Sequence, residues 1–153
     1  MRESILITIG AIGGTIASYL GGWDYFLRAL IILMCVDYVS DIVVAGVFKK
    51  SKKSQNGKLN SHTGFKGIIK KCMMILMVLI AYQLDYVIGW HFVRYAVIIA
   101  FLTNELISIM ENTALMGVPV PAILQKAIDF LIKKGDEKNA KINAKINQNQ
   151  KER

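Results

Sequence analysis

Three apolar stretches of the sequence are long enough to cross a lipid bilayer as helices: residues 29–48, 68–88 and 92–116. At a rise of about 1.5 Å per residue, each covers the roughly 30 Å of hydrocarbon in a typical bilayer. We expect helices because an open strand in lipid would leave its backbone groups unpaired. Hydrophobic residues make up 54% of the chain, above the roughly 45–50% of soluble domains. The sequence therefore predicts an all-α membrane protein.

A fourth apolar stretch, residues 4–20, comes first in the chain and is shorter. Its run from 5 to 20 covers only about 24 Å as a helix, so three to four membrane crossings are expected. Glu3 partly offsets Arg2, and no small-residue cleavage site follows, so we interpret residues 1–22 as a retained membrane helix and not as a signal peptide.

The first stretch also carries small residues at helical spacing, which allow helices to approach closely in lipid. Two rows are present, one of Gly10, Gly14 and Ser18, the other of Gly13, Ala17 and Gly21. Contact within one subunit and contact between subunits both remain open. The rows alone do not decide whether the chain forms a homo-oligomer.

Lysines between the second and third stretches set the expected orientation. The connection at residues 49–67 contains several lysines and no acidic residue. Cytoplasmic loops are enriched in lysine and arginine, so this loop is expected to be cytoplasmic. Two further crossings return the C-terminus to the cytoplasm, where its own lysines agree. Residues 23–118 then form a three-helix core around a basic cytoplasmic loop. The net charge of +8 follows this membrane pattern, and no nucleic-acid partner is expected.

The fourth stretch is followed by residues that break a helix: Gly117, Pro119 and Pro121. Residues 119–134 then carry an amphipathic pattern, and such a helix with lysines on its polar face is expected to lie on the inner leaflet. A partner-binding helix is the alternative. Residues 135–153 are expected to form a polar basic tail, either solvated or as an extension of the helix.

Polar residues inside the spans are the most informative part of the sequence, since a charge at mid-bilayer costs at least about 2.5 kcal/mol. Asp37, Ser40 and Asp41 lie on the second span, and Asn104, Glu105, Ser108, Glu111 and Asn112 form a stripe on the fourth. We expect them to line a shared aqueous path. The alternative is that they join the helices within one subunit.

Depth along the helices suggests ion pairs for some of these carboxylates. Asp41 and Glu111 lie near the cytoplasmic ends of their spans, at the level where Lys70 and Lys71 enter the third helix. For Asp37 and Glu105, no cation is expected at the same level. At least one of them should then be protonated in a dry bundle, whereas both could stay charged in a hydrated lumen.

No sequence motif indicates an enzyme, a metal site or a cofactor. A glycine-rich phosphate loop, paired Cys and His ligands and a nucleophile motif are all absent. Cys35 and Cys72 lie in separate apolar runs and are expected to be small buried side chains. Catalytic residues are therefore not assigned.

Four sequence pieces in order resemble a known family. They are Asp37-Tyr38-x-Ser40, Asn60-Ser61-x-x-Gly64-x-x-Gly67-x-x-Lys70-Lys71, Asn104-Glu105-x-x-Ser108-Ile109-x-Glu111-Asn112 and Gly117-x-Pro119-x-Pro121. Together they are similar to the phage holin family that includes clostridial toxin-release holins. The resemblance implies a multi-pass protein of the bacterial cytoplasmic membrane that oligomerises into a lesion and releases an endolysin or a toxin.

One position departs from that pattern, because Asp41 stands where the family has Gly. A second carboxylate one turn from Asp37 adds like-charge repulsion. Either the position is tolerant, or Asp41 weakens or redirects lesion formation.

Two other functions remain open. Buried acidic residues would also suit a small ion channel or transporter, although broken half-helices or repeated halves are not evident in the sequence. A membrane anchor that recruits a partner through its C-terminal helix is the second alternative.

Overall fold

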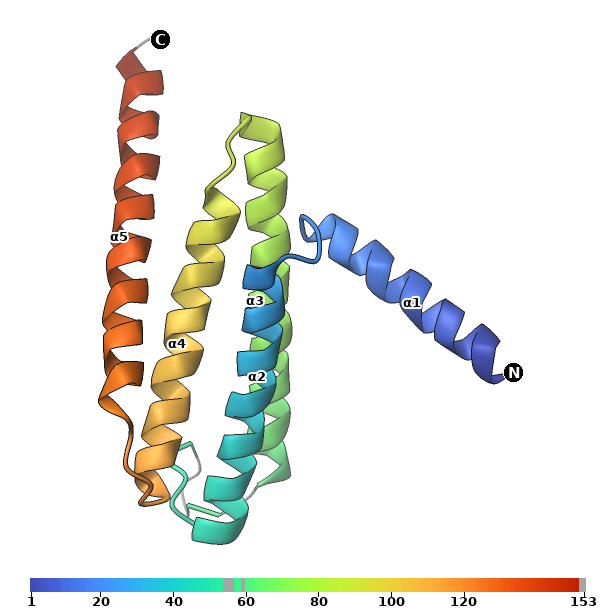
Figure 1. The fold of residues 1–153 in the computed structure, drawn as a ribbon, viewed down its shortest axis with the longest axis vertical. Helices are drawn as coiled ribbons and strands as arrows, with labels where there is room; N and C mark the ends of the chain where they lie inside the picture. Colours follow the sequence, from blue (N-terminus) through green and yellow to red (C-terminus); the bar gives the residue numbers. More distant parts are fainter. Residues whose placement is uncertain (54–56, 59, 152–153) are drawn as a thin grey trace.

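The computed structural model describes residues 1–53, 57–58 and 60–151, and the regular structure in these ranges is helical. The elements are α1 (Arg2–Tyr19), α2 (Tyr25–Val43), the π-helical turn η1 (Val44–Phe48), α3 (Ser61–Ile88), α4 (Val93–Leu115) and α5 (Ala122–Lys151). Figure 1 shows α2 to α5 running alongside one another, with α1 projecting away from them. The all-α fold class predicted from the sequence is confirmed.

Three helices are long and apolar enough to cross a membrane: Tyr25–Phe48, which joins α2 and η1, Ser61–Ile88 and Val93–Leu115. They pack around a shared core of buried side chains. The core is formed by Leu20, Leu27, Leu30, Met34, Val78, Ile98 and Leu102. Many outward apolar side chains stay exposed, as expected for helices whose solvent is lipid.

Helix α3 begins earlier than the apolar run suggested. Asn60 caps it by accepting a hydrogen bond from the His62 amide at 3.0 Å. Residues 61–67 therefore belong to the helix, not to the basic loop in which the sequence analysis placed them. A side-chain cap of this kind starts a helix whatever the hydropathy of the first turn. The loop between η1 and α3 is correspondingly shorter.

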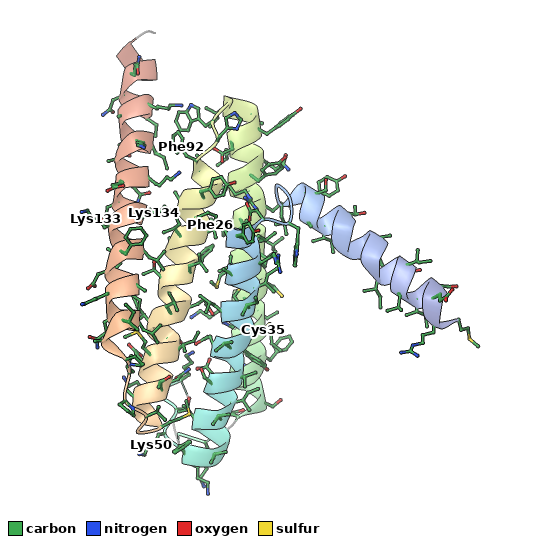
Figure 2. All side chains as sticks on the ribbon, in the orientation of Figure 1. Phe26, Cys35, Lys50, Phe92, Lys133 and Lys134 are labelled. Atoms are coloured by element: carbon green, nitrogen blue, oxygen red, sulfur yellow. The ribbon has the colours of Figure 1, made fainter. Side chains whose placement is uncertain are left out.

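Helix α5 lies alongside α4 and does not end at Lys134 but continues to Lys151 (Figure 1). It contacts α4 along much of its length, although Ile128 is the only buried residue between residues 122 and 148. Lys134 lies over the Phe26 ring at 5.3 Å and Lys138 over the Tyr95 ring at 5.6 Å. In Figure 2, Lys134 lies between α5 and the bundle.

The cysteines differ from the sequence-based expectation. Cys35 on α2, labelled in Figure 2, and Cys72 on α3 are free thiols, and both are exposed on the isolated subunit. Residues in apolar runs are expected to avoid water. On a membrane helix they can do so by facing lipid as well as by packing in the protein core. The expectation of burial inside the subunit was wrong.

Candidate functional site

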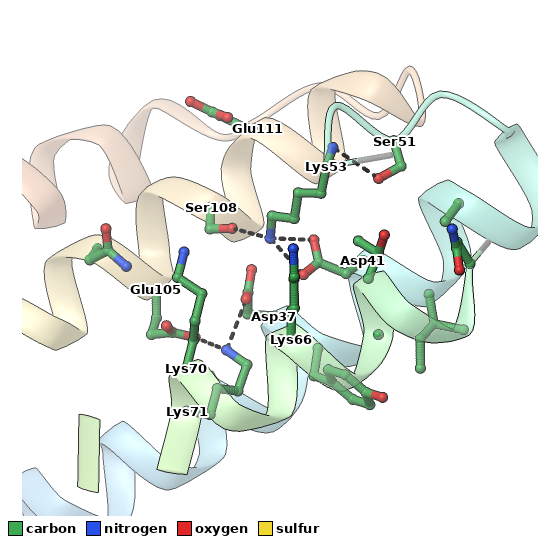
Figure 3. A pocket seen from close by; sticks show the side chains of 18 of the residues that line it. Asp37, Asp41, Ser51, Lys53, Lys66, Lys70, Lys71, Glu105, Ser108 and Glu111 are labelled. Carbon is green, nitrogen blue, oxygen red and sulfur yellow. Dashed lines mark hydrogen bonds and ion pairs between the residues drawn. The ribbon is translucent and has the colours of Figure 1, made fainter. Parts of the chain in front are cut away.

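A polar cavity of about 470 Å³ lies at the end of the bundle that carries the basic loop. We call this the polar cavity (Figure 3). Helices α2, α3 and α4 and the loop after η1 all contribute to it. Its charged lining consists of Asp37, Asp41, Lys53, Lys58, Lys66, Lys70, Lys71, Glu105 and Glu111. A cavity of this size and polarity has room for several water molecules.

Lys71 joins two buried carboxylates at the deep end of the polar cavity. Its Nζ lies 2.9 Å from Asp37 Oδ2 and 2.5 Å from Glu105 Oε2, so α3 is tied to α2 and to α4. The Asp37 and Glu105 side chains are only 5% and 4% exposed. Such a pair is costly to desolvate, and removing one partner leaves an uncompensated buried charge.

This arrangement corrects the pairing inferred from depth. Lys71 was expected near Asp41 and Glu111, and Asp37 and Glu105 were expected to lack a cation. Consecutive residues on a helix point about 100° apart, so Lys70 and Lys71 cannot both face the same partners. Lys71 faces the interior, and Lys70 forms no ion pair with any residue that the structure describes.

The charges of the interior cluster do not balance, because two carboxylates share a single ammonium. Asp37 Oδ1 is also the one buried side-chain oxygen or nitrogen in the described residues that lacks a hydrogen-bond partner. A buried acceptor without a donor costs about 1–3 kcal/mol. The cluster is therefore a place where a water molecule, a proton or a new contact would be stabilising.

Asp41 belongs to a second layer, nearer the loop. Lys53 Nζ lies 2.6 Å from Asp41 Oδ2, and the Asn112 amide donates to Asp41 Oδ1 at 2.9 Å and to Ser40 Oγ at 2.8 Å. Lys53 also approaches Ser108 Oγ at 3.5 Å. This layer connects α2, the loop and α4.

The remaining polar residues predicted for the site lie at its margin. Glu111 is 3.9 Å from Lys52, and both side chains are exposed. Asn104 is exposed and lines the polar cavity. Gly64 and Gly67 lie against Tyr38, since a Cβ on either residue would be 3.6–3.7 Å from its side chain. Pieces far apart in the sequence thus meet around one cavity.

The residues predicted to pack helices or to break them lie outside this cavity. Gly10, Gly13 and Gly14 on α1 have nothing within 4 Å of an added Cβ, so no helix of the subunit covers that face. Ser18 is exposed and Ala17 is buried. Gly21 lies past the end of α1, in a turn with φ +90°. Gly117, Pro119 and Pro121 lie between α4 and α5.

A second charged cluster, at the opposite end of the bundle, was missed in the sequence. Arg94 is only 3% exposed. Its guanidinium donates to Asp24 Oδ2 at 2.6 Å and to the carbonyls of Leu20 and Gly22. The sequence did carry a signal for this cluster, because Arg94 is a cation near the start of an apolar span, where a charge requires a partner.

Asp85 completes this cluster from α3. Its carboxylate accepts hydrogen bonds from the backbone amides of Phe92, Val93 and Arg94 at 2.9–3.3 Å, the first amides of α4. Amides at the start of an α-helix have no carbonyl partner within that helix. Asp85 therefore caps α4 across the turn and fixes the angle between α3 and α4.

Asp24 precedes α2 and serves as its N-cap, accepting from the Leu27 amide at 2.8 Å. Burial opposes ionisation of Asp24. The hydrogen bonds from Arg94 and from the Leu27 amide, with the charge of Arg94, outweigh burial, so the pKa of Asp24 lies below its ordinary value of 3.8. This end of the bundle therefore acts as a structural clamp.

Among the described residues, neither cluster provides a set of metal ligands. Within the described part of the chain, no group of three or more His, Cys, Asp or Glu side chains is placed to hold a metal ion. What the polar cavity offers is charge and hydrogen-bonding capacity inside three apolar helices, which suits contact with water or with charged groups.

Comparison with known proteins points to one family. The model of the bacteriophage holin family matches residues 14–133. An uncharacterized protein of Listeria innocua is 40% identical over 137 residues, covering 87% of this chain and 92% of that protein. A probable holin of Bacillus phage phi105 is 26% identical over 125 residues, covering 81% of this chain and 87% of that protein.

A further relative comes from Clostridium perfringens, an uncharacterized 14.9 kDa protein from the region 3' of nagH. It is 34% identical over 122 residues, covering 77% of this chain and 86% of that protein. No solved structure matches. The family match spans all three candidate membrane helices and the polar cavity between them, and the chain therefore belongs to the bacteriophage holin family.

Proposed function

We propose that this protein is a holin that oligomerises in the bacterial cytoplasmic membrane and forms a lesion, through which an endolysin or a toxin passes. It acts without catalysis, and its C-terminus is cytoplasmic. The observation that carries the proposal is the Asp37–Lys71–Glu105 cluster inside three apolar helices. Family membership and the resemblance to a probable holin support it.

The cluster suits a protein that exists both as a closed subunit and as part of an assembled lesion. In the single subunit, Lys71 neutralises only part of the charge of Asp37 and Glu105, and Asp37 Oδ1 lacks a partner. Contact with water in an assembled lesion would satisfy these groups at lower cost than a closed bundle in lipid. The residues around the polar cavity would then turn toward the aqueous path.

The test is to neutralise the two carboxylates separately, as Asp37→Asn and Glu105→Gln. Each change balances the cluster charge, so we expect the closed subunit to be favoured and the onset of cell lysis to be delayed. Glu137→Gln, an exposed change on α5, is the matched control. If both cluster variants lyse cells with wild-type timing and lesion size, the assignment of these residues to the lumen is wrong.

Release assays with vesicles separate a lesion from a selective channel. A holin lesion is expected to release a small dye and a folded protein together, because it lacks a selective path. A channel or transporter would release the dye, or a particular ion, and retain the folded protein. Retention of the protein by fully active preparations would contradict the proposal.

A further inference from the structure

Two lysines of the polar cavity stand out because the cluster of buried ion pairs does not use them. Lys66 and Lys70 lie one turn apart on α3, both line the cavity, and both are exposed. Neither forms an ion pair with any residue that the structure describes. Figure 3 shows the two side chains extending in the same direction from α3.

The acidic residues of the cavity are already engaged and cannot serve as their partners. Asp37 and Glu105 bind Lys71, Asp41 binds Lys53, and Glu111 is close to Lys52. The amines of Lys66 and Lys70, with that of Lys58 nearby in the lining, thus leave positive charge at the opening.

The surroundings of these lysines place the opening at the surface of the bilayer. On the same turns of α3, the apolar side chains of Phe65, Ile68 and Ile69 are 63%, 44% and 47% exposed. Exposed apolar side chains of this size on a membrane helix face acyl chains. Lysines beside them lie at the depth of lipid headgroups, where long basic side chains extend toward phosphates.

The cavity also has apolar wall that a bare anion would not use. Ile42 and Met74 contribute aliphatic surface and Tyr38 an aromatic ring. A ligand with a phosphate group and an attached apolar portion would match both parts. Basic pockets between membrane helices on the cytoplasmic side are known to accept anionic headgroups.

We propose that the opening of the polar cavity binds an anionic phospholipid through its headgroup phosphodiester, with Lys66 and Lys70 contacting the phosphate oxygens. This inference rests on the fold and its place in the membrane, and does not depend on lesion formation. A variant that forms no lesion but keeps the fold should still bind the lipid.

Lipid selectivity in bilayers tests the site directly. The full chain is reconstituted in phosphatidylcholine vesicles, and the fraction of spin-labelled lipid immobilised by the protein is compared for phosphatidylglycerol and phosphatidylcholine. The wild type should prefer phosphatidylglycerol. Lys66→Gln with Lys70→Gln should reduce that preference by about fivefold for each lysine lost, as expected for a basic side chain at an anionic lipid surface.

Lys49→Gln with Lys50→Gln is the matched control, because both residues are exposed in the same basic region and neither lines the cavity. The control should keep the preference. An equal loss in both double variants would mean diffuse charge attraction and would overturn the proposal, as would no loss in the cavity variant. Lys66→Arg with Lys70→Arg should retain binding, and its failure to do so counts against the site.

Added inorganic phosphate distinguishes a lipid from a soluble anion. If the lipid's apolar portion contributes to binding, millimolar inorganic phosphate should leave the preference for phosphatidylglycerol unchanged. Displacement of the lipid at that concentration would identify soluble phosphate as the occupant and overturn the assignment to a lipid. Circular dichroism of each variant establishes that the helices are intact.

Discussion

At the residue scale, charged side chains connect the helices at both ends of the bundle. Lys71 joins α3 to α2 and α4 at one end of the bundle, and Arg94 joins α4 to the turn between α1 and α2 at the other. Each is a cation with more than one acceptor. Between the two ends the helices are held by apolar packing alone, so the polar residues fix their rotation and register.

The Asp24–Arg94 contact predicts a pH-dependent contribution to stability. Because the pKa of Asp24 is lower in the folded state than its ordinary value of 3.8, its stabilising effect is present above that value and is lost as pH falls through the folded pKa. Asp24→Asn should therefore lower the thermal midpoint in detergent at pH 7.

The difference between Asp24→Asn and the wild type should shrink as pH falls below 4. The Asp24 side chain is 28% exposed, so the expected loss at pH 7 is about 1 kcal/mol. The N-cap is retained in Asp24→Asn, because the Asn side-chain oxygen can accept the same hydrogen bond from the Leu27 amide. Comparing the two proteins at each pH cancels the titration of other carboxylates. A constant difference across the range would contradict the assigned charge interaction.

Asp41 makes a prediction about activity, since it binds both Lys53 and Asn112. Removing the carboxylate should loosen the layer that joins α2, the loop and α4, and should relieve repulsion from Asp37. We expect Asp41→Gly to bring forward the onset of cell killing. Asp41→Ala separates loss of the charge from the backbone freedom of glycine. Unchanged onset in both variants would show that the position is tolerant.

At the scale of elements, the sequence predicted the spans well and their mutual rotation poorly. Apolar length identified the three candidate membrane helices, and the residues of the polar stripes do meet. Depth along a helix follows directly from residue number, whereas the partner of a side chain depends on the direction in which each helix faces. This is why Lys71 was assigned to the wrong carboxylates and why the partners of Arg94 were not foreseen.

Helix α5 contacts α4 along its length, but most of its side chains stay exposed. Ile128 is buried and Leu131 packs against the core. Lys134 and Lys138 make cation–π contacts with Phe26 of α2 and Tyr95 of α4, and such contacts are worth about 0.5–1 kcal/mol each at exposed sites. Each of its lysines would cost at least about 2.5 kcal/mol at the bilayer centre. The structure places α5 along α4 as far as the Lys145 contacts with Trp90 and Phe92, whereas the lysines and the amphipathic pattern of α5 predict an interfacial position in a bilayer.

Deleting residues 122–153 tests what α5 contributes. The buried core residues lie outside α5, which adds only the partly buried Leu131 to them, so we expect the shortened chain to insert in the membrane and to lyse cells with altered timing. An anchor that acts through this helix would instead lose all function. Membrane fractionation beside a lysis curve distinguishes the two results, and complete loss of lysis by inserted protein would favour the anchor.

At the scale of the whole molecule, α1 is the part that the subunit leaves uncovered. Its small residues Gly10, Gly13 and Gly14 face no other helix, and its apolar side chains, such as Ile7 at 71%, are exposed. Small residues favour close helix contact in lipid. In the oligomer proposed above, this surface is expected to form the contact between subunits.

Gly14→Leu should reduce assembly without disturbing the subunit, because a side chain at this position meets nothing within 4 Å. Thr15→Leu adds bulk at a neighbouring exposed position away from the small-residue rows and serves as control. Chemical cross-linking in membranes and the size of the extracted particle are the measurements. Equal oligomer size in the two variants would place the subunit contacts elsewhere.

The attachment of α1 has a mechanical consequence. Gly21 lies so close to Arg94 and Tyr82 that an added Cβ would overlap them, and Arg94 binds the carbonyls on both sides of Gly21. A rod of about 27 Å fixed only at one end behaves as a lever. A tilt of about 5° at this pivot would move the far tip by about 2 Å, so the Arg94 guanidinium would influence where α1 meets a neighbouring subunit in the proposed oligomer.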